Sequence, residues 1–133
     1  MKAWTLIAHG KPQRAFALRE HPEPQPKPNQ VLIRVEGFGL NYADAMAVRG
    51  LYREAPPLPS IIGYEVVGRV ERIGQEVHDG LVGKRVVAMT RFGGYADVVC
   101  APQGQVFARP EGMSAFDGAA LPVNYITAWQ LVV

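Results

Sequence analysis

The sequence predicts a mainly β fold: a small β-barrel, kinked by glycines, with short helices. At least six short runs rich in β-branched residues occupy roughly the first 110 residues, where no long helical pattern occurs. Glycines interrupt these runs, as at Gly63, Gly68 and Gly74, which indicates tight strand curvature. The length of 133 residues, 48% of them hydrophobic, fits one complete domain.

Composition excludes several other classes of protein. Gly and Pro make up about 19% of the chain, below the level typical of disorder. The net charge is +2 and no run of five like charges occurs, so we expect no nucleic-acid partner. No apolar stretch spans a bilayer and no signal pattern is found, which predicts a cytoplasmic chain without a transmembrane segment. Cys100 is the only cysteine, which excludes an internal disulfide.

The N-terminal region predicts a pair of strands. Ala3–Ala8 and Phe16–Leu18 are apolar runs separated by His9–Pro12, which has the composition of a turn. In His21–Asn29 four prolines alternate with other residues, which predicts an extended surface connection. A ligand for a proline-reading domain is the alternative interpretation of that segment.

A strand and a short helix come next. Val31–Val35 alternates in the manner of a strand. Asn41–Arg49 has helical character, with Asn41 as N-cap and Asp44 in the first turn. The three prolines of Leu51–Pro59 predict a loop.

The remainder of the chain changes from strand to helix patterns. Three runs predict further strands: Tyr64–Ile73, Arg85–Ala88 and Tyr95–Cys100. Ser114 is a suitable N-cap for a helix over Ala115–Leu121, and Tyr125–Val133 is helical with no stop signal. A helix without a C-cap is typical of a truncated chain, so we expect the complete protein to continue.

One motif resembles a known superfamily. The letters GYEVVGRVERIGQEV over Gly63–Val77 resemble the G-H-E-x-x-G-x-V-x-x-x-G-x-x-V signature of the medium-chain dehydrogenases/reductases. Lys84–Val86, Gly93–Asp97 and Ala119–Thr127 are similar to later segments of that superfamily, in the same order.

A second run narrows the resemblance. Gly39–Asp44 together with Arg49–Tyr52 is similar to the G-x-N-x-x-D…R-x-G-x-Y segment of the zinc-free quinone oxidoreductases. Within that branch, Leu121–Ala128 is most similar to the homologues of a synaptic vesicle protein.

The resemblance implies an architecture and a cofactor. Residues 1–118 would form a GroES-like catalytic domain, and 119–133 would begin the interdomain helix of a truncated cofactor-binding domain. That absent domain would be a Rossmann domain that binds NADPH, since no glycine-rich phosphate loop occurs in this chain. The complete protein would be a homodimer.

The residues do not support a zinc site. Zinc ligands are cysteine, histidine and carboxylate side chains. Where zinc-dependent relatives carry their cysteine and histidine ligands, this chain has Asn41 and Tyr64, and the four-cysteine lobe is reduced to Cys100.

Several polar residues are candidates for chemistry. Hydride transfer to a quinone or an enone develops negative charge on the acceptor oxygen, which hydroxyl or amide donors can stabilise. We therefore assign Tyr52 and Tyr42 as candidate catalytic residues. The resemblance implies that the nicotinamide end of the cofactor lies against Asn41, Tyr42, Asp44, Met46, Asn124 and Thr127. The candidate acceptor walls are Phe38, Leu51, Tyr52 and Met89.

Structural roles are the alternatives for these residues. Asn41 can be a helix cap, the tyrosines can be half-buried packing, and Thr127 can bond to its own turn. Glu65 is an anchor at the barrel mouth or acts directly on the substrate. The three histidines, His9, His21 and His78, are expected at the solvated surface, and Cys100 is expected to be a small buried apolar residue.

Two functions are compatible with the sequence. In the first, the chain is the substrate-side domain of a zinc-independent NADPH-dependent quinone or enone oxidoreductase, inactive by itself because the platform for the cofactor is missing. In the second, it is a non-enzymatic GroES-like module that binds a protein or lipid partner through its proline-rich rim or apolar mouth.

Overall fold

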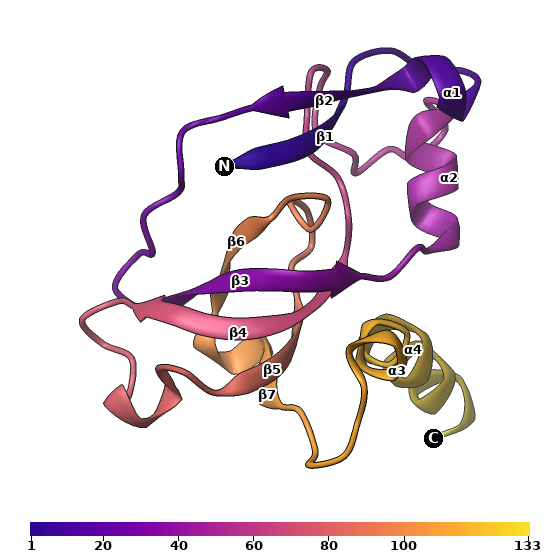
Figure 1. Cartoon of the computed structure of the whole chain (residues 1–133). Helices are drawn as coiled ribbons and strands as arrows, with labels where there is room; N and C mark the ends of the chain where they lie inside the picture. The colour runs from indigo at the N-terminus through magenta and orange to yellow at the C-terminus, as the bar shows by residue number, and fades with distance from the viewer.

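The computed structural model describes residues 1–133 and contains seven strands and four α-helices (Figure 1). The strands are β1 (Lys2–Leu6), β2 (Phe16–Glu20), β3 (Gln30–Phe38), β4 (Glu65–Ile73), β5 (Arg85–Met89), β6 (Val98–Pro102) and β7 (Val106–Ala108). The helices are α1 (Pro12–Ala15), α2 (Tyr42–Val48), α3 (Ala115–Ala119) and α4 (Pro122–Val132), with 3-10 turns η1 (Asp79–Leu81) and η2 (Gln103–Gln105). No helix combines the length and the apolar character needed to traverse a bilayer.

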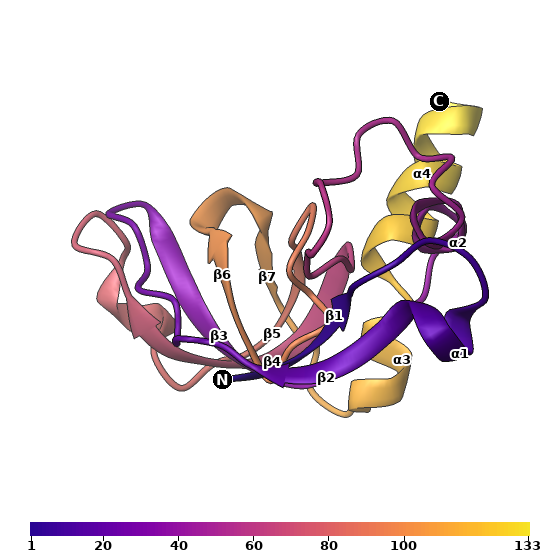
Figure 2. The ribbon, with the colours of Figure 1, turned by 90° about the horizontal axis from the view of Figure 1, so that it is seen from above.

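The strands form two antiparallel sheets. The larger has the order β6-β3-β4-β5-β7, and the smaller consists of β1 and β2. The larger sheet bends strongly, so that β6 and β7 rise from the plane of β3 and β4 (Figure 2). This curved sheet with short helices confirms the mainly β fold predicted from the sequence.

The curvature of the sheet has a local cause in β3 and β4. The pairing of these strands shifts register between Leu32 and Ile33 and again between Val35 and Gly37. Gly68 lies opposite Val35, and a Cβ atom at Gly68 would lie 2.1 Å from the backbone oxygen of Arg34. The two backbones can approach this closely only because Gly68 has no side chain.

Two apolar clusters fill the interior. The first lies within the larger sheet and consists of Val31, Ile33, Val66, Val70, Val77, Val86, Ala88, Val99 and Ala101. The second joins the hairpin to α2 and consists of Leu6, Ala15, Ala47, Val48, Ile62 and Tyr95. Burial of these side chains is the main source of stability and fixes α2 against the β1–β2 hairpin.

Three expectations from the sequence require correction. The turn expected at His9–Pro12 leads directly into α1, because Pro12 occupies the first helical turn, where its fixed φ is favourable. The strand expected over Tyr95–Cys100 begins at Val98, because Tyr95 and Ala96 bond to β1 and to the Ile62 region instead of to β3. Strand β7 was not expected, since it is three residues long and mostly exposed.

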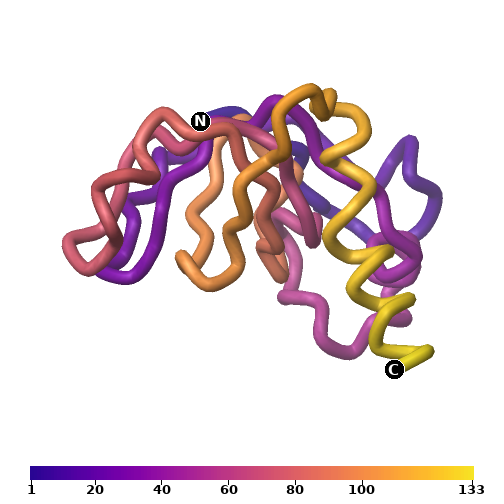
Figure 3. The backbone as a smooth tube through the Cα atoms, turned by 90° about the horizontal axis from the view of Figure 1, so that it is seen from below, coloured from indigo at the N-terminus to yellow at the C-terminus, as the bar shows by residue number.

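Helices α2 and α4 lie at one end of the molecule, and η1 lies at the opposite end (Figures 1 and 2). In the backbone trace, α4 projects from the body beside α2 and carries the C-terminus (Figure 3). We call the region formed by these two helices the α2–α4 end.

Replacing Gly68 by alanine should destabilise the fold. The added methyl group would meet the backbone oxygen of Arg34 and the side chain of Ile33, so β3 and β4 must separate. We expect a loss of about 3 kcal/mol in the free energy of unfolding, measured by urea denaturation. Gly104→Ala is the matched control, because a Cβ atom at Gly104 meets nothing within 4 Å. Equal stability of the two variants would contradict the close approach of β3 and β4.

Candidate functional site

The carboxylate of Glu65 joins three elements at the α2–α4 end. Glu65 begins β4 and is fully buried. Its Oε1 accepts a hydrogen bond from Asn41 Nδ2 at 2.9 Å, and its Oε2 accepts one from the backbone N–H of Val123 at 2.9 Å. The anchor interpretation of Glu65 is thereby confirmed: one side chain connects the start of α2 with the first turn of α4.

The approach of these elements depends on Gly39. A Cβ atom at Gly39 would lie 2.2 Å from Glu65 Oε1 and 2.4 Å from the backbone oxygen of Ala119. The backbone oxygen of Ala119 faces this point at the end of α3, so any side chain at Gly39 would displace either β4 or α3. The Glu65 junction therefore requires glycine here.

Helix α2 begins with the cap expected from the sequence. Asn41 is the N-cap, and its backbone N–H donates to Asp44 Oδ2 at 2.8 Å in a capping box. The side-chain amide of Asn41 gives one hydrogen to Glu65, and its second N–H has no partner within the chain. Asn41 is thus a helix cap that still carries one free donor.

Asp44 is an ionisable group inside the protein. Its residue is only 4% exposed, and its Oδ1 has no hydrogen-bond partner. Burial raises the pKa of the Asp44 carboxyl, and the bond from Asn41 together with the nearby Tyr95 and Gly63 lowers the pKa in part. Asp44 also raises the pKa of the Tyr95 hydroxyl, although burial has the larger effect on that group.

Aromatic side chains gather next to Glu65. The ring of Tyr64 meets Tyr52 edge to face at 6.0 Å between centroids and lies 5.3 Å from Phe92. The Tyr64 hydroxyl is buried and has no hydrogen-bond partner. Burial, followed by the neighbouring Tyr52, raises the pKa of Tyr64, so the phenol remains protonated.

A cavity of about 520 Å³ opens beside this aromatic group. Its wall includes Tyr64, Met89, Thr90, Arg91, Cys100 and Val123. The volume lies within the usual range of small-molecule pockets, roughly 300–1,000 Å³. Tyr64 and Val123 adjoin Glu65 on either side, so the cavity reaches the Glu65 junction, whereas Gln30, Pro102 and Gln105 extend its wall to the far end of β3 and the β6–β7 turn.

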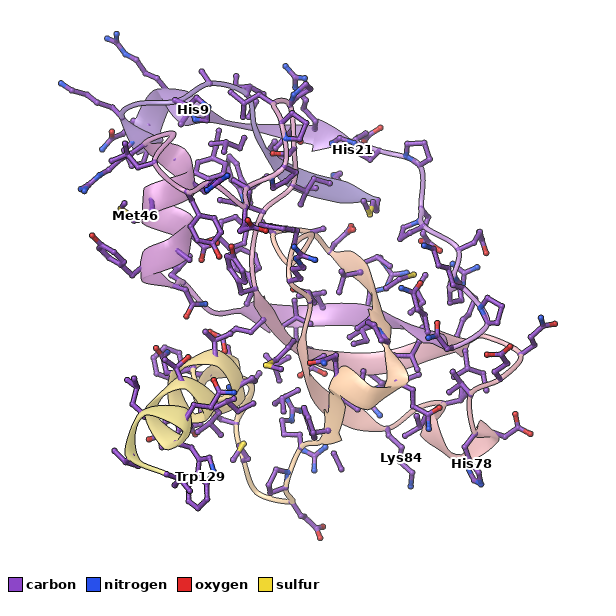
Figure 4. All side chains as sticks on the ribbon, turned by 180° about the vertical axis from the view of Figure 1, so that it is seen from behind. His9, His21, Met46, His78, Lys84 and Trp129 are labelled. Carbon is purple, nitrogen blue, oxygen red and sulfur yellow. The ribbon has the colours of Figure 1, made fainter.

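The structure brings together only some of the sequence-predicted cofactor residues. Asn41 and α4 are joined through Glu65, whereas Tyr42 is 76% exposed and Met46 lies on α2, above α4 in the view of Figure 4. Asn124 Nδ2 donates to the backbone oxygen of Ala120 at 3.3 Å. Thr127 is exposed on α4, and its hydroxyl makes no bond to its own turn.

The structure also brings together only some of the residues predicted to line the acceptor site. Met89 is on the cavity wall, and Tyr52 packs against Tyr64 beside it. Phe38 instead packs on Tyr95 at 4.7 Å in the interior, and Leu51 is 65% exposed. The cavity is therefore lined by only part of the set that the sequence predicts.

The histidines lie outside this site, whereas Cys100 is on the cavity wall. The prediction of a solvated His21 is wrong: His21 is partly buried and its Nε2 lies 2.8 Å from Thr5 Oγ1. His9 is exposed beside α2, and His78 is exposed at the opposite end (Figure 4). Cys100 is half-buried, and burial raises the pKa of its thiol. No three His, Cys, Asp or Glu side chains are grouped so as to hold a metal ion.

Sequence reasoning missed the contributions of Thr90, Arg91 and Val123. Thr90 Oγ1 donates to the backbone oxygen of Gly63 at 2.8 Å, which fixes the turn after β5 against the start of β4. A backbone N–H such as that of Val123 has no sequence signature. For Arg91 the only available signal was its place between a strand and Gly93, which does not by itself indicate a site.

Replacing Glu65 by glutamine should loosen α4. Glutamine presents an N–H₂ group where one carboxylate oxygen now accepts, so either Asn41 or Val123 loses its acceptor. We expect a loss of about 2 kcal/mol in unfolding free energy and faster hydrogen exchange of the Val123 amide. The exposed Glu111→Gln is the control. Unchanged exchange at Val123 would rule out the anchoring role.

Replacing Asp44 by asparagine should remove a pH-dependent component of stability. Because the pKa of Asp44 is raised by folding, the folded state binds the proton more tightly than the unfolded state. The stability contribution is therefore present at low pH and is lost as pH rises through the folded-state pKa. We expect the free energy of unfolding, measured with urea, to fall less with rising pH in Asp44→Asn than in the wild type. The exposed Asp79→Asn should show the same pH dependence as the wild type.

Comparison with known proteins is consistent with this geometry. The alcohol dehydrogenase GroES-like domain family matches residues 27–111. The synaptic vesicle membrane protein VAT-1 homolog of Danio rerio is 39% identical over 98% of this chain. The structure of the human VAT-1 homolog-like protein superposes with a TM-score of 0.94 at 33% identity over 99% of the chain. The quinone oxidoreductase of Thermus thermophilus, whose structure is known also in complex with NADPH, gives a TM-score of 0.82 at 38% identity over 98%.

The chain spans only part of these relatives. It covers 27% of the Danio rerio protein, 42% of the human structure and 39% of the Thermus thermophilus enzyme. The family match extends over more than half of the chain and coincides with the curved sheet that carries Glu65. The chain therefore belongs to the alcohol dehydrogenase GroES-like domain family, in the branch of the medium-chain dehydrogenases/reductases that contains the VAT-1 homologues and the quinone oxidoreductases.

Proposed function

We propose that this chain is the substrate-side domain of an oxidoreductase that uses NADPH, but no zinc, to reduce a quinone or an enone. The observation that carries the proposal is its similarity to a quinone oxidoreductase whose complex with NADPH is known. Asn41 and Tyr64 support the zinc-free form, because they stand where zinc-dependent relatives carry ligands and neither side chain is a usual zinc ligand.

Groups at the α2–α4 end fit the nicotinamide end of the cofactor. Asn41 has one amide N–H left after its bond to Glu65, and Asn124 keeps its side-chain oxygen free. Thr127 adds an exposed hydroxyl. These donors and acceptors suit a carboxamide, and Glu65 holds the two helices that carry them in a fixed relation. NADPH, when bound, supplies the hydride.

The tyrosines are assigned to the acceptor. When hydride adds to a quinone or enone, negative charge develops on the carbonyl oxygen, and a positioned hydroxyl stabilises that charge. Tyr52 is the stronger candidate, since its ring is packed against Tyr64 beside the cavity. Tyr42 is exposed next to Asn41 and would require the remainder of the protein to enclose it.

The proposal assigns residues 1–118 to the substrate-side domain and 119–133 to the start of the segment that leads to a cofactor-binding domain. One face of helix α3 packs on the larger sheet, since Gly118 is buried against Val67 and Val87. Helix α4 presents Tyr125 and Trp129 to solvent, as expected of a helix that another domain covers. We propose that the complete protein is a homodimer.

Turnover by the complete protein that contains this chain tests the proposal. We expect it to oxidise NADPH in the presence of a simple quinone, at a rate that a zinc chelator leaves unchanged. The 133-residue chain alone should give no turnover, because positioning of the cofactor supplies much of the rate.

Three outcomes would contradict this assignment. Loss of activity with chelator would contradict the zinc-free mechanism, and turnover by the chain alone would contradict the need for a second domain. A folded complete protein with no affinity for NADPH would instead favour a non-enzymatic module that binds a protein or lipid partner.

A further inference from the structure

The wall of the cavity beside Tyr64 includes a single charged residue. Its other polar wall residues are neutral, and they include Gln30, Thr90 and Gln105. Arg91 is the one ionised side chain on the wall. Because the Arg91 side chain is largely exposed, its charge lies at the open rim of the cavity, and Glu54, its ion-pair partner, is not a wall residue.

The backbone holds Arg91 in an unusual conformation. Its φ is +55°, the only positive φ at a non-glycine residue in the chain. The turn is held on both sides: Thr90 N–H donates to the Tyr64 oxygen at 2.8 Å, and Phe92 N–H donates to the Thr90 oxygen at 2.6 Å. Glycine would occupy this conformation without strain, and strained residues of this kind gather at functional sites.

The guanidinium of Arg91 is available to a ligand. It lies 5.9 Å from the centroid of the Phe92 ring and 3.3 Å from Glu54. The side chains of Arg91 and Glu54 are 76% and 62% exposed, so their pairing is weak and open to exchange. The guanidinium can then present two parallel N–H groups to a carboxylate.

The remaining wall suits a flat molecule. The ring of Tyr64 lies on the wall, and Phe92, which is not a wall residue, packs on it with the ring centroids 5.3 Å apart; the buried Tyr64 hydroxyl makes no hydrogen bond within the chain. Aromatic walls favour planar conjugated groups, and a buried hydroxyl without a partner is a site for a ligand oxygen.

We propose that Arg91 is a specificity-determining residue, and that the acceptor is a planar conjugated carbonyl compound bearing a carboxylate, which pairs with Arg91 at the mouth of the cavity. This inference rests on the proposed function for the reaction itself. The recognition of an anionic planar ligand is a property of this chain alone.

Binding of two matched probes to the 133-residue chain tests the inference. The probes are 2-naphthoate and 2-naphthamide, which share a flat ring system and differ in charge. We expect the naphthoate to bind about three- to fivefold more tightly, as measured by NMR titration of the Arg91 and Thr90 amides, and added salt to reduce the difference.

Two substitutions and a control identify the residue responsible. Arg91→Gln and Arg91→Gly should each bind naphthoate and naphthamide with equal affinity. Because glycine adopts the positive φ of residue 91 without strain, loss of folding cannot explain the result for Arg91→Gly. Arg53→Gln is the control, because Arg53 is an exposed arginine in the same loop as Glu54 and makes no hydrogen bond or ion pair. Equal binding of both probes by wild type, or retained preference in Arg91→Gln, would overturn the proposal.

Two further measurements separate the alternatives. The first is competition of inorganic phosphate and of acetate against bound naphthoate. If phosphate displaces naphthoate more effectively than acetate does, Arg91 binds a phosphate group and the carboxylate proposal is overturned. In the complete protein, Arg91→Gln should lower the ratio of kcat/KM for carboxylated over neutral quinones by a similar factor. A complete protein without turnover, whose chain still prefers naphthoate, would refute the proposed function and leave the role of Arg91 supported.

Discussion

The buried carboxylate of Glu65 is the constraint on which the α2–α4 end depends. A carboxylate removed from water is tolerated only where donors replace the lost hydration, and here the donors come from two different helices. Helices α2 and α4 are thereby fixed to the first residue of β4, with Gly39 leaving the space that the junction needs. The positions of Asn41, of the α4 side chains and of the cavity wall at Val123 all follow from this one group.

Local signals predicted the elements well, whereas contacts between distant segments were beyond the sequence. Asn41 and Asp44 predicted the N-cap and the first turn of α2, and valine-rich runs predicted β3, β4 and β5, because both depend on neighbours along the chain. Strand β6 begins later than predicted because Tyr95 bonds to β1, which lies about ninety residues earlier in the sequence.

The same distinction holds at the candidate site. An anchor was one of two roles that the sequence left open for Glu65, but its partners include a backbone N–H, which no side-chain pattern indicates. The unpartnered hydroxyl of Tyr64 and the positive φ of Arg91 are properties of the folded chain. The sequence identifies polar side chains that could bind a ligand. Only the structure shows which of them already make hydrogen bonds within the chain and which have donors or acceptors available.

The exposed indole of Trp129 provides the chain with a spectroscopic reporter. The protein has two tryptophans: Trp4 in the β1–β2 hairpin and Trp129 in α4. Trp129 lies on the outer side of α4, 67% exposed (Figure 4). Indole emission shifts to shorter wavelength on leaving water, so a Trp4→Phe background would make the intrinsic fluorescence a direct optical signal for whatever covers that helix.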